Sequence, residues 1–169
     1  LLVCDIGGGT TDLTLVGVVD EGGELALRRL AVGPHLLVGG DNMDLALAFA
    51  VAEKFTGIGV NLDPWQSISL WHSCRAAKEQ LLASEGPAEQ TITVLTRGTR
   101  LVGGSKSVPL ARDEAANLLL DGFFPRCALG DKPAKRRGSG FQDLGLAYEQ
   151  DTGITRHVAA FLSSQGTDS

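Results

Sequence analysis

The sequence predicts a mixed α/β fold, with an antiparallel three-stranded meander plus helices and a second, α+β part. Short apolar runs near the start are separated by glycine-rich turns, and two longer segments of helical character follow between residues 42 and 82. After them comes QTITVLT, which alternates in the manner of a strand. The chain has 169 residues, 43% of them apolar and 21% charged, which is enough for one sizeable domain or two small lobes.

The first predicted elements are strands at residues 1–5, 11–19 and 24–32. Residues 1–5 are expected to be a buried strand because they are apolar up to Asp5. The sequence Asp-Glu-Gly-Gly at 20–23 is typical of a tight turn, so the second and third strands should form a hairpin. The run LALRRL could also be helical, but the hairpin-like turn before it favours a strand.

Two helices are predicted next. Asp41 or Asn42 is the expected N-cap of the first, an apolar helix that the glycines at 57 and 59 should end. Asp63 is the expected N-cap of the second, with Pro64 at its first helical position and its end near Leu82. The apolar stripe expected on the second helix comprises Ile68, Trp71, Cys74, Ala77 and Leu81.

The remaining elements are shorter. QTITVLT should be a strand, Arg97-Gly98-Thr99 a turn, and RLVGG or SKSVP should supply its partner. ARDEAANLLLDGFF should be an amphipathic helix, and residues 130–140 a polar, basic surface loop. Asp151 should cap a last helix through Leu162, and the tail SSQGTDS should fray. The buried stripe expected on this helix comprises Ile154, Val158, Phe161 and Leu162.

Charge and composition argue against several function classes. A net charge of −5 provides no basic field for nucleic acid, and no apolar run is long enough to span a bilayer. The three cysteines are far apart and lack metal-ligand spacing, so we expect a reduced, cytoplasmic protein. His35, His72 and His157 are expected to be isolated from carboxylates and to serve packing or surface roles.

The most informative stretch is DIGGGTTD at residues 5–12. Glycine lets backbone N–H groups approach an anion closely, so the amides around Gly7, Gly8, Gly9 and Thr10 could cradle a phosphate. The two aspartates would repel a phosphate but could position Mg²⁺ through its water molecules. The alternative is a plain hairpin turn with solvated carboxylates beside it. No Gly-Lys-Ser/Thr follows, so this is not a Walker loop.

DIGGGTTD followed by strands resembles the second phosphate motif of the actin-like ATPase superfamily. Downstream, GGDNMDLALA and LWHSCRAAKEQLLAS resemble segments of the DnaK-like, seventy-kilodalton heat-shock chaperones. The order of these segments matches over about the whole chain. The resemblance implies an actin-like (ribonuclease H-like) second lobe of a nucleotide-binding domain, with residues 1–38 and 125–169 as its phosphate-binding inner subdomain and 39–124 as its outer, adenosine-side subdomain.

The resemblance also implies roles for individual residues. Asp5, Thr10 and Asp12 would be catalytic, with Asp5 and Asp12 binding Mg²⁺ through water. Lys78 would lie at the nucleoside of ATP or ADP, although a solvated helix face is an equal alternative for it. The phosphate-binding residues would be Gly7, Gly8, Gly9, Thr10, Gly39 and Gly40.

The chain is therefore expected to be a fragment of a chaperone ATPase, with little hydrolysis of its own. Its partners would be the first lobe of its own domain, a client protein or a co-chaperone. Open sheet edges should also favour self-association. The alternatives are a lobe of a bacterial actin-like filament protein, a sugar or acid kinase, and a degenerate lobe that only binds.

Overall fold

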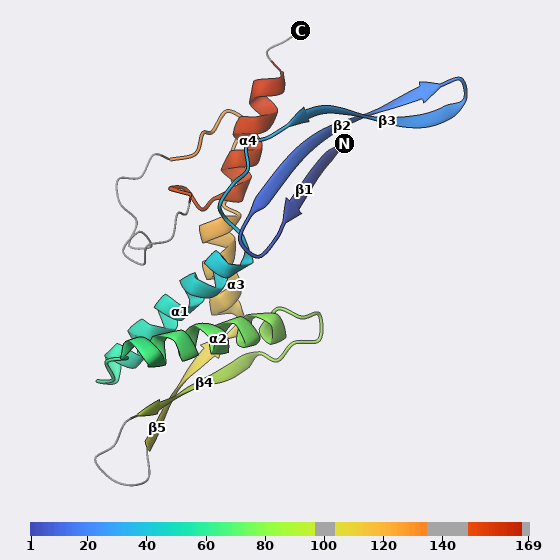
Figure 1. Ribbon diagram of the computed structural model, residues 1–169. Coiled ribbons are helices and arrows are strands. Elements are labelled where there is room, and N and C mark those ends of the chain that lie inside the picture. Colours follow the sequence, from blue (N-terminus) through green and yellow to red (C-terminus); the bar gives the residue numbers. More distant parts are fainter. Residues whose placement is uncertain (97–103, 135–148, 167–169) are drawn as a thin grey trace. The chain divides into compact units, whose positions relative to one another are not determined.

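A computed structural model describes residues 1–96, 104–134 and 149–166 of a mixed α/β protein (Figure 1). Contacts between residues divide the chain into two units. The first unit comprises Leu1–Gly40 with Gly122–Ser169, and the second comprises Asp41–Asp121. Of the helices in the described ranges, none combines the length and apolar character needed to cross a bilayer.

The first unit contains a three-stranded antiparallel sheet in the order β1-β2-β3, which confirms the predicted meander. Its strands are β1 (Leu2–Ile6), β2 (Thr11–Glu21) and β3 (Glu24–Val32). Gly22 and Gly23, with φ of 70° and 95°, form the turn between β2 and β3. Such positive angles are those of the hairpin turns that match strand twist, which explains the Gly-Gly pair. The far half of β2 pairs only with β3, so this hairpin extends beyond β1 (Figure 1).

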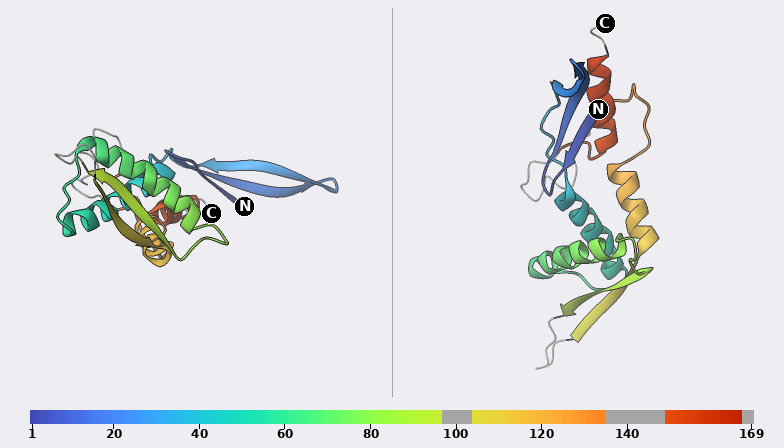
Figure 2. Two further views of the ribbon diagram at one scale, coloured as in Figure 1. Left: turned by 90° about the horizontal axis from the view of Figure 1, so that it is seen from below. Right: turned by 90° about the vertical axis from the view of Figure 1, so that its right-hand side faces the viewer.

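The prediction that the first strand is buried is wrong. Val3 and Ile6 in β1 are 44% and 40% exposed, whereas Leu13 in the central strand β2 is 1% exposed. Within the described part of the chain, β1 and β3 are the edges of the sheet, and α4 (Ile154–Gln165) packs against β2 (Figures 1 and 2). An apolar run of this length cannot distinguish a covered strand from an edge strand.

Helix α4 begins at Gly153 as N-cap, so the prediction that Asp151 caps it is also wrong. Asp151 lies two residues earlier, accepts a hydrogen bond from the Gly153 amide at 2.8 Å and is buried. Ile154 and Phe161 are buried as predicted, but Val158 and Leu162 are only half-buried, and Ala159 takes their place.

The second unit begins with two helices of the predicted type. Helix α1 (Gly40–Gly57) starts before the expected caps Asp41 and Asn42. It buries Leu47, Val51 and Phe55. These residues recur every four positions along one side of the helix, which is the spacing of a core-facing stripe.

Helix α2 (Pro64–Leu81) confirms the predicted cap and Pro64 position. Asp63 accepts a hydrogen bond from the Gln66 amide, and the Gln66 side chain accepts one from the Asp63 amide, which completes a capping box. The predicted stripe is partly wrong, because Ile68 is 57% exposed and Leu70 is buried instead. Gln66 lies on the buried side together with Leu70, and its side-chain Nε2 donates to the carbonyl oxygen of Leu95 in β4 at 2.5 Å.

A hairpin and a helix complete the second unit. Strand β4 (Glu89–Thr96) confirms the strand predicted at QTITVLT, and it pairs antiparallel with β5 (Gly104–Ala111), which contains SKSVP. Helix α3 (Arg112–Phe123) is the predicted amphipathic helix. The predicted turn at 97–99, most of RLVGG, most of the basic loop and the last residues of the tail lie outside the described residues.

Candidate functional site

The glycine loop, defined as residues Gly7, Gly8, Gly9 and Thr10, joins β1 to β2. Its two ends are tied together, because the Gly7 amide donates to the Thr10 carbonyl oxygen at 2.8 Å. The Gly7 carbonyl in turn accepts a hydrogen bond from the Gly40 amide at 3.0 Å. The loop is therefore a tight turn held on both sides.

Three successive amides of the glycine loop are available to a ligand. Among the described residues, the N–H groups of Gly8, Gly9 and Thr10 donate to no other group. Gly8 and Gly9 are exposed. Because backbone N–H groups require an acceptor, these three must be satisfied by water or by a bound anion. Gly7, which was also predicted to bind phosphate, uses its amide inside the turn.

Asp5 and Asp12 flank the glycine loop as directly opposed residues of β1 and β2. Opposed residues of an antiparallel pair project from the same face of the sheet, so the two carboxylates lie side by side there. Both residues are exposed. Asp5 forms no ion pair within the described ranges. Like charges in opposed positions are unfavourable unless a cation offsets them.

The prediction that His35 is isolated from carboxylates is wrong. Its Nδ1 lies 2.7 Å from Asp12 Oδ1. A backbone bridge between Thr11 and Leu36 places the preceding His35 opposite the following Asp12, so Asp5, Asp12 and His35 form a row across one face. The two side chains of the pair are 61% and 53% exposed. The two residues are 23 positions apart in the sequence, so no local pattern predicts this pairing.

Thr11 anchors the segment that carries His35, a role that the sequence analysis missed. Its side chain is fully buried, and its hydroxyl donates to the Val38 carbonyl oxygen at 2.8 Å. Its amide donates to the Leu36 carbonyl at 2.9 Å and its carbonyl accepts from the Leu36 amide at 3.1 Å. Leu36 and Val38 are 2% and 0% exposed, so apolar burial and hydrogen bonding hold this segment against the start of β2.

Gly39 and Gly40 lie against the glycine loop. A Cβ atom added to Gly39 would stand 2.5 Å from the Gly7 oxygen and 2.6 Å from the Gly8 oxygen, so only glycine permits this approach. Gly40 is the first residue of α1. Its amide donates to the Gly7 carbonyl oxygen at 3.0 Å, so this contact supports the loop.

Lys78 belongs to the second unit, where it forms an ion pair with Asp44. Lys78 Nζ lies 2.6 Å from Asp44 Oδ1, and the two side chains are 17% and 2% exposed. Lys78 is therefore not on a solvated helix face. Burial, and then the charge of Asp44, raise the pKa of the nearby Cys74 thiol to about 12. The buried ion pair between Lys78 and Asp44 joins α2 to α1.

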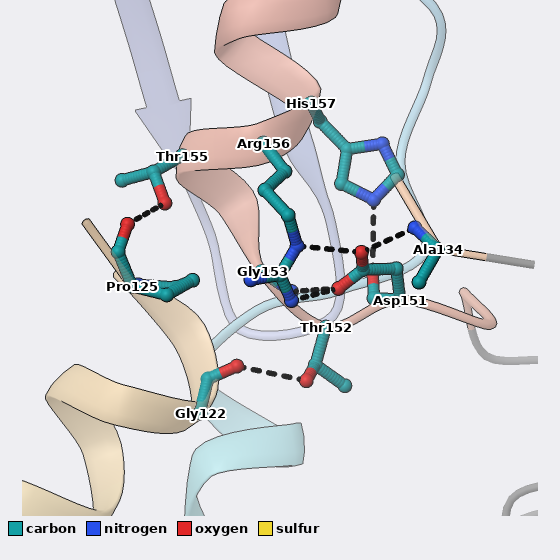
Figure 3. A network of polar contacts seen from close by, with 9 residues as sticks. All are labelled: Gly122, Pro125, Ala134, Asp151, Thr152, Gly153, Thr155, Arg156 and His157. Atoms are coloured by element: carbon teal, nitrogen blue, oxygen red, sulfur yellow. Dashed lines mark hydrogen bonds and ion pairs between the residues drawn. The ribbon is translucent and has the colours of Figure 1, made fainter. Parts of the chain in front are cut away.

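A second polar cluster surrounds Asp151 in the first unit (Figure 3). Its carboxylate accepts hydrogen bonds from Arg156 and from the amides of Ala134 and Gly153. Burial alone would raise the pKa of Asp151, but these bonds and the Arg156 charge outweigh it and hold that pKa well below its usual range. His157 Nε2 lies 2.8 Å from the Asp151 carbonyl oxygen. Both carboxylate oxygens of Asp151 have hydrogen-bond partners, so the cluster stabilises the start of α4.

The carboxylates beside the glycine loop suit a hydrated cation. Among the described side chains, no group of three or more His, Cys, Asp or Glu residues could hold a metal ion. Two carboxylates do fit Mg²⁺, which keeps several of its waters and takes further oxygen ligands from phosphates. The donor set is therefore compatible with Mg²⁺ bound together with a polyphosphate.

A comparison of the sequence with models of known protein families finds no match.

Proposed function

We propose that the glycine loop binds the polyphosphate of ATP or ADP. The observation that carries the proposal is the run of three amides, at Gly8, Gly9 and Thr10, that donate to no group among the described residues. Successive N–H groups in a turn form a concave site for anions. The Thr10 hydroxyl adds a further donor beside these amides.

Asp5 and Asp12 would bind Mg²⁺ through its water molecules. The metal supplies charge neutralisation at the phosphate oxygens, which the carboxylates by themselves would repel. The role of the two side chains is to accept hydrogen bonds from coordinated water and to hold an attacking water in place. Catalysis would then depend on positioning and charge neutralisation rather than on a covalent intermediate.

We propose further that the chain is one lobe of an actin-like ATPase, and that the whole protein is a DnaK-like chaperone. The order of DIGGGTTD, GGDNMDLALA and LWHSCRAAKEQLLAS along the chain supports this, as does the antiparallel meander that follows the first motif. In such a protein, ATP would close this lobe on a first lobe, and hydrolysis would release them. Client proteins and co-chaperones would be the partners.

Calorimetry on the 169-residue chain with pyrophosphate and with Mg·ADP tests the binding proposal. The informative variant is Gly9→Ala, because nothing lies within 4 Å of the added Cβ and the loop itself need not move. The methyl group would occupy space that a phosphate needs, so we expect binding at least about tenfold weaker, a change of about 1.4 kcal/mol.

Gly57→Ala is the matched control, because its added Cβ also meets nothing within 4 Å. It should bind both ligands as the unchanged chain does. Equal affinities for the unchanged chain and Gly9→Ala, or no binding of either ligand by the unchanged chain, would contradict the proposal.

A further inference from the structure

The row formed by Asp5, Asp12 and His35 contains a hydrogen bond whose direction follows from its chemistry. An ionised carboxylate can only accept hydrogen bonds, so the His35 Nδ1 atom, 2.7 Å from Asp12 Oδ1, must carry the proton and donate it. The bond engages one oxygen of Asp12. It thereby limits rotation of a carboxylate that stands opposite a second negative charge, Asp5.

The backbone that carries His35 is fixed on both sides of this residue. Leu36 exchanges two backbone hydrogen bonds with Thr11, and the Gly33 amide donates to the Leu13 carbonyl oxygen at 2.8 Å. Thr11 and Leu13 are 0% and 1% exposed, so the strand that His35 faces is itself anchored in the core. The imidazole is therefore presented to Asp12 by rigid elements, which is the condition for orienting a ligand side chain.

We propose that His35 is a positioning residue for the divalent cation of the glycine-loop site. By holding Asp12 Oδ1, it keeps the other oxygen of Asp12 on the face shared with Asp5, where both can accept hydrogen bonds from coordinated water. Residues that orient metal ligands in this way typically contribute 10- to 100-fold in metal affinity. The inference rests on the proposed function, because it concerns the cation that accompanies the polyphosphate.

The alternative is an ordinary surface contact. The two side chains are 61% and 53% exposed, and exposed ion pairs contribute little to stability. The two roles differ in what a mutation changes. A surface contact affects folding slightly and metal binding not at all, whereas a positioning contact affects metal binding with the fold intact.

The test uses the 169-residue chain, with all measurements made at one fixed pH. Pyrophosphate affinity without metal is measured by calorimetry, and Mn²⁺ affinity with pyrophosphate present is measured by electron paramagnetic resonance. The variants are His35→Ala, His35→Asn, whose amide nitrogen can stand near the position of Nδ1, and the control His72→Ala. His72 is also exposed but stacks on Trp71 in the second unit.

We expect His35→Ala to weaken Mn²⁺ binding about tenfold. Metal-free pyrophosphate affinity and the thermal midpoint should stay close to those of the unchanged chain. His35→Asn should restore most of the Mn²⁺ affinity, and His72→Ala should change nothing.

Unchanged Mn²⁺ affinity in His35→Ala would overturn the inference while leaving the proposed function standing. Weakened Mn²⁺ binding that His35→Asn does not restore would also overturn it, because the imidazole would then act as a ligand and not through Asp12. Absence of pyrophosphate binding in all four proteins would overturn the proposed function, and the inference with it.

Discussion

Asp5 of β1 and Asp12 of β2 are directly opposed across an antiparallel pair, on either side of the glycine loop. A sheet gains nothing from two like charges at this position, and opposed pairs of one sign are destabilising. The cation that we propose for this site would offset the repulsion between the two carboxylates.

Asp5→Asn should stabilise the metal-free chain. Removing one charge relieves the repulsion and leaves the bond between Asp12 and His35 intact, so we expect the free energy of unfolding to rise by about 0.5 kcal/mol. Urea denaturation with and without Mg²⁺ measures this, and added Mg²⁺ with pyrophosphate should stabilise the unchanged chain more than the variant. Glu85→Gln, at an exposed carboxylate without an ion pair in the described ranges, is the control. A less stable Asp5→Asn would contradict this explanation.

Gly39→Ala should destabilise the first unit. The added Cβ would stand 2.5 Å from the Gly7 carbonyl oxygen. Both atoms are fixed directly to the backbone, so neither can move away without moving the chain. Overpacking of this kind costs about 1–3 kcal/mol, which denaturant unfolding can measure. Gly9→Ala is the control in the same unit, since its Cβ meets nothing within 4 Å. Equal stability of the two variants would show that Gly39 does not approach the loop so closely.

Lys78→Met should lower the free energy of unfolding by about 3 kcal/mol, because Asp44 would lose its cation in a buried position. Chemical denaturation gives the value, and Lys106→Met, at an exposed lysine of β5, is the control. A lysine needed only at a nucleoside would leave stability unchanged in the absence of ligand. That result would remove the structural role assigned to Lys78.

Asp151 should make the first unit acid-sensitive. Its pKa is lowered in the folded chain, so its contribution to stability is full above the unfolded carboxyl pKa of about 3.9 and is lost as pH falls toward the folded-state value. Asp151→Asn should therefore be less stable than the unchanged chain at pH 7 by about 3 kcal/mol. The difference in stability between the two proteins should become smaller between about pH 4 and pH 2. Thermal unfolding at several pH values measures this difference. A gap that stays constant with pH would mean that the charge of Asp151 is not what stabilises α4.

The sequence correctly predicts those features of the fold that depend on a few neighbouring residues, such as helix caps and tight turns. Asp63 and Pro64 specify the start of α2, and Gly22 and Gly23 specify the turn of the β2–β3 hairpin. The rotation of α2 could not be predicted in this way. The buried side of α2 faces β4, where Gln66 donates to the carbonyl oxygen of Leu95, 29 positions later in the sequence.

Of the candidate site, the sequence predicts the glycine loop and the two aspartates beside it, but not the contact between His35 and Asp12. DIGGGTTD indicates free amides between two carboxylates because glycine and aspartate have narrow chemical uses. The pairing of His35 with Asp12 depends on the segment that Thr11 anchors, and no spacing in the sequence reports that contact. The misassignment of Asp151 has a local cause, because its partner Arg156 lies only five residues later, inside the helix that Asp151 was expected to cap.

The central claim is that the amides of Gly8, Gly9 and Thr10 bind a polyphosphate. The most direct measurement is a titration of the ¹⁵N-labelled chain with Mg·ADP and with pyrophosphate, followed through the amide resonances in two-dimensional NMR spectra. We expect saturable shifts that are largest at these three residues, with smaller shifts at Asp5, Asp12 and Gly40. Shifts confined to other parts of the chain, or none at ligand concentrations well above physiological levels, would contradict it.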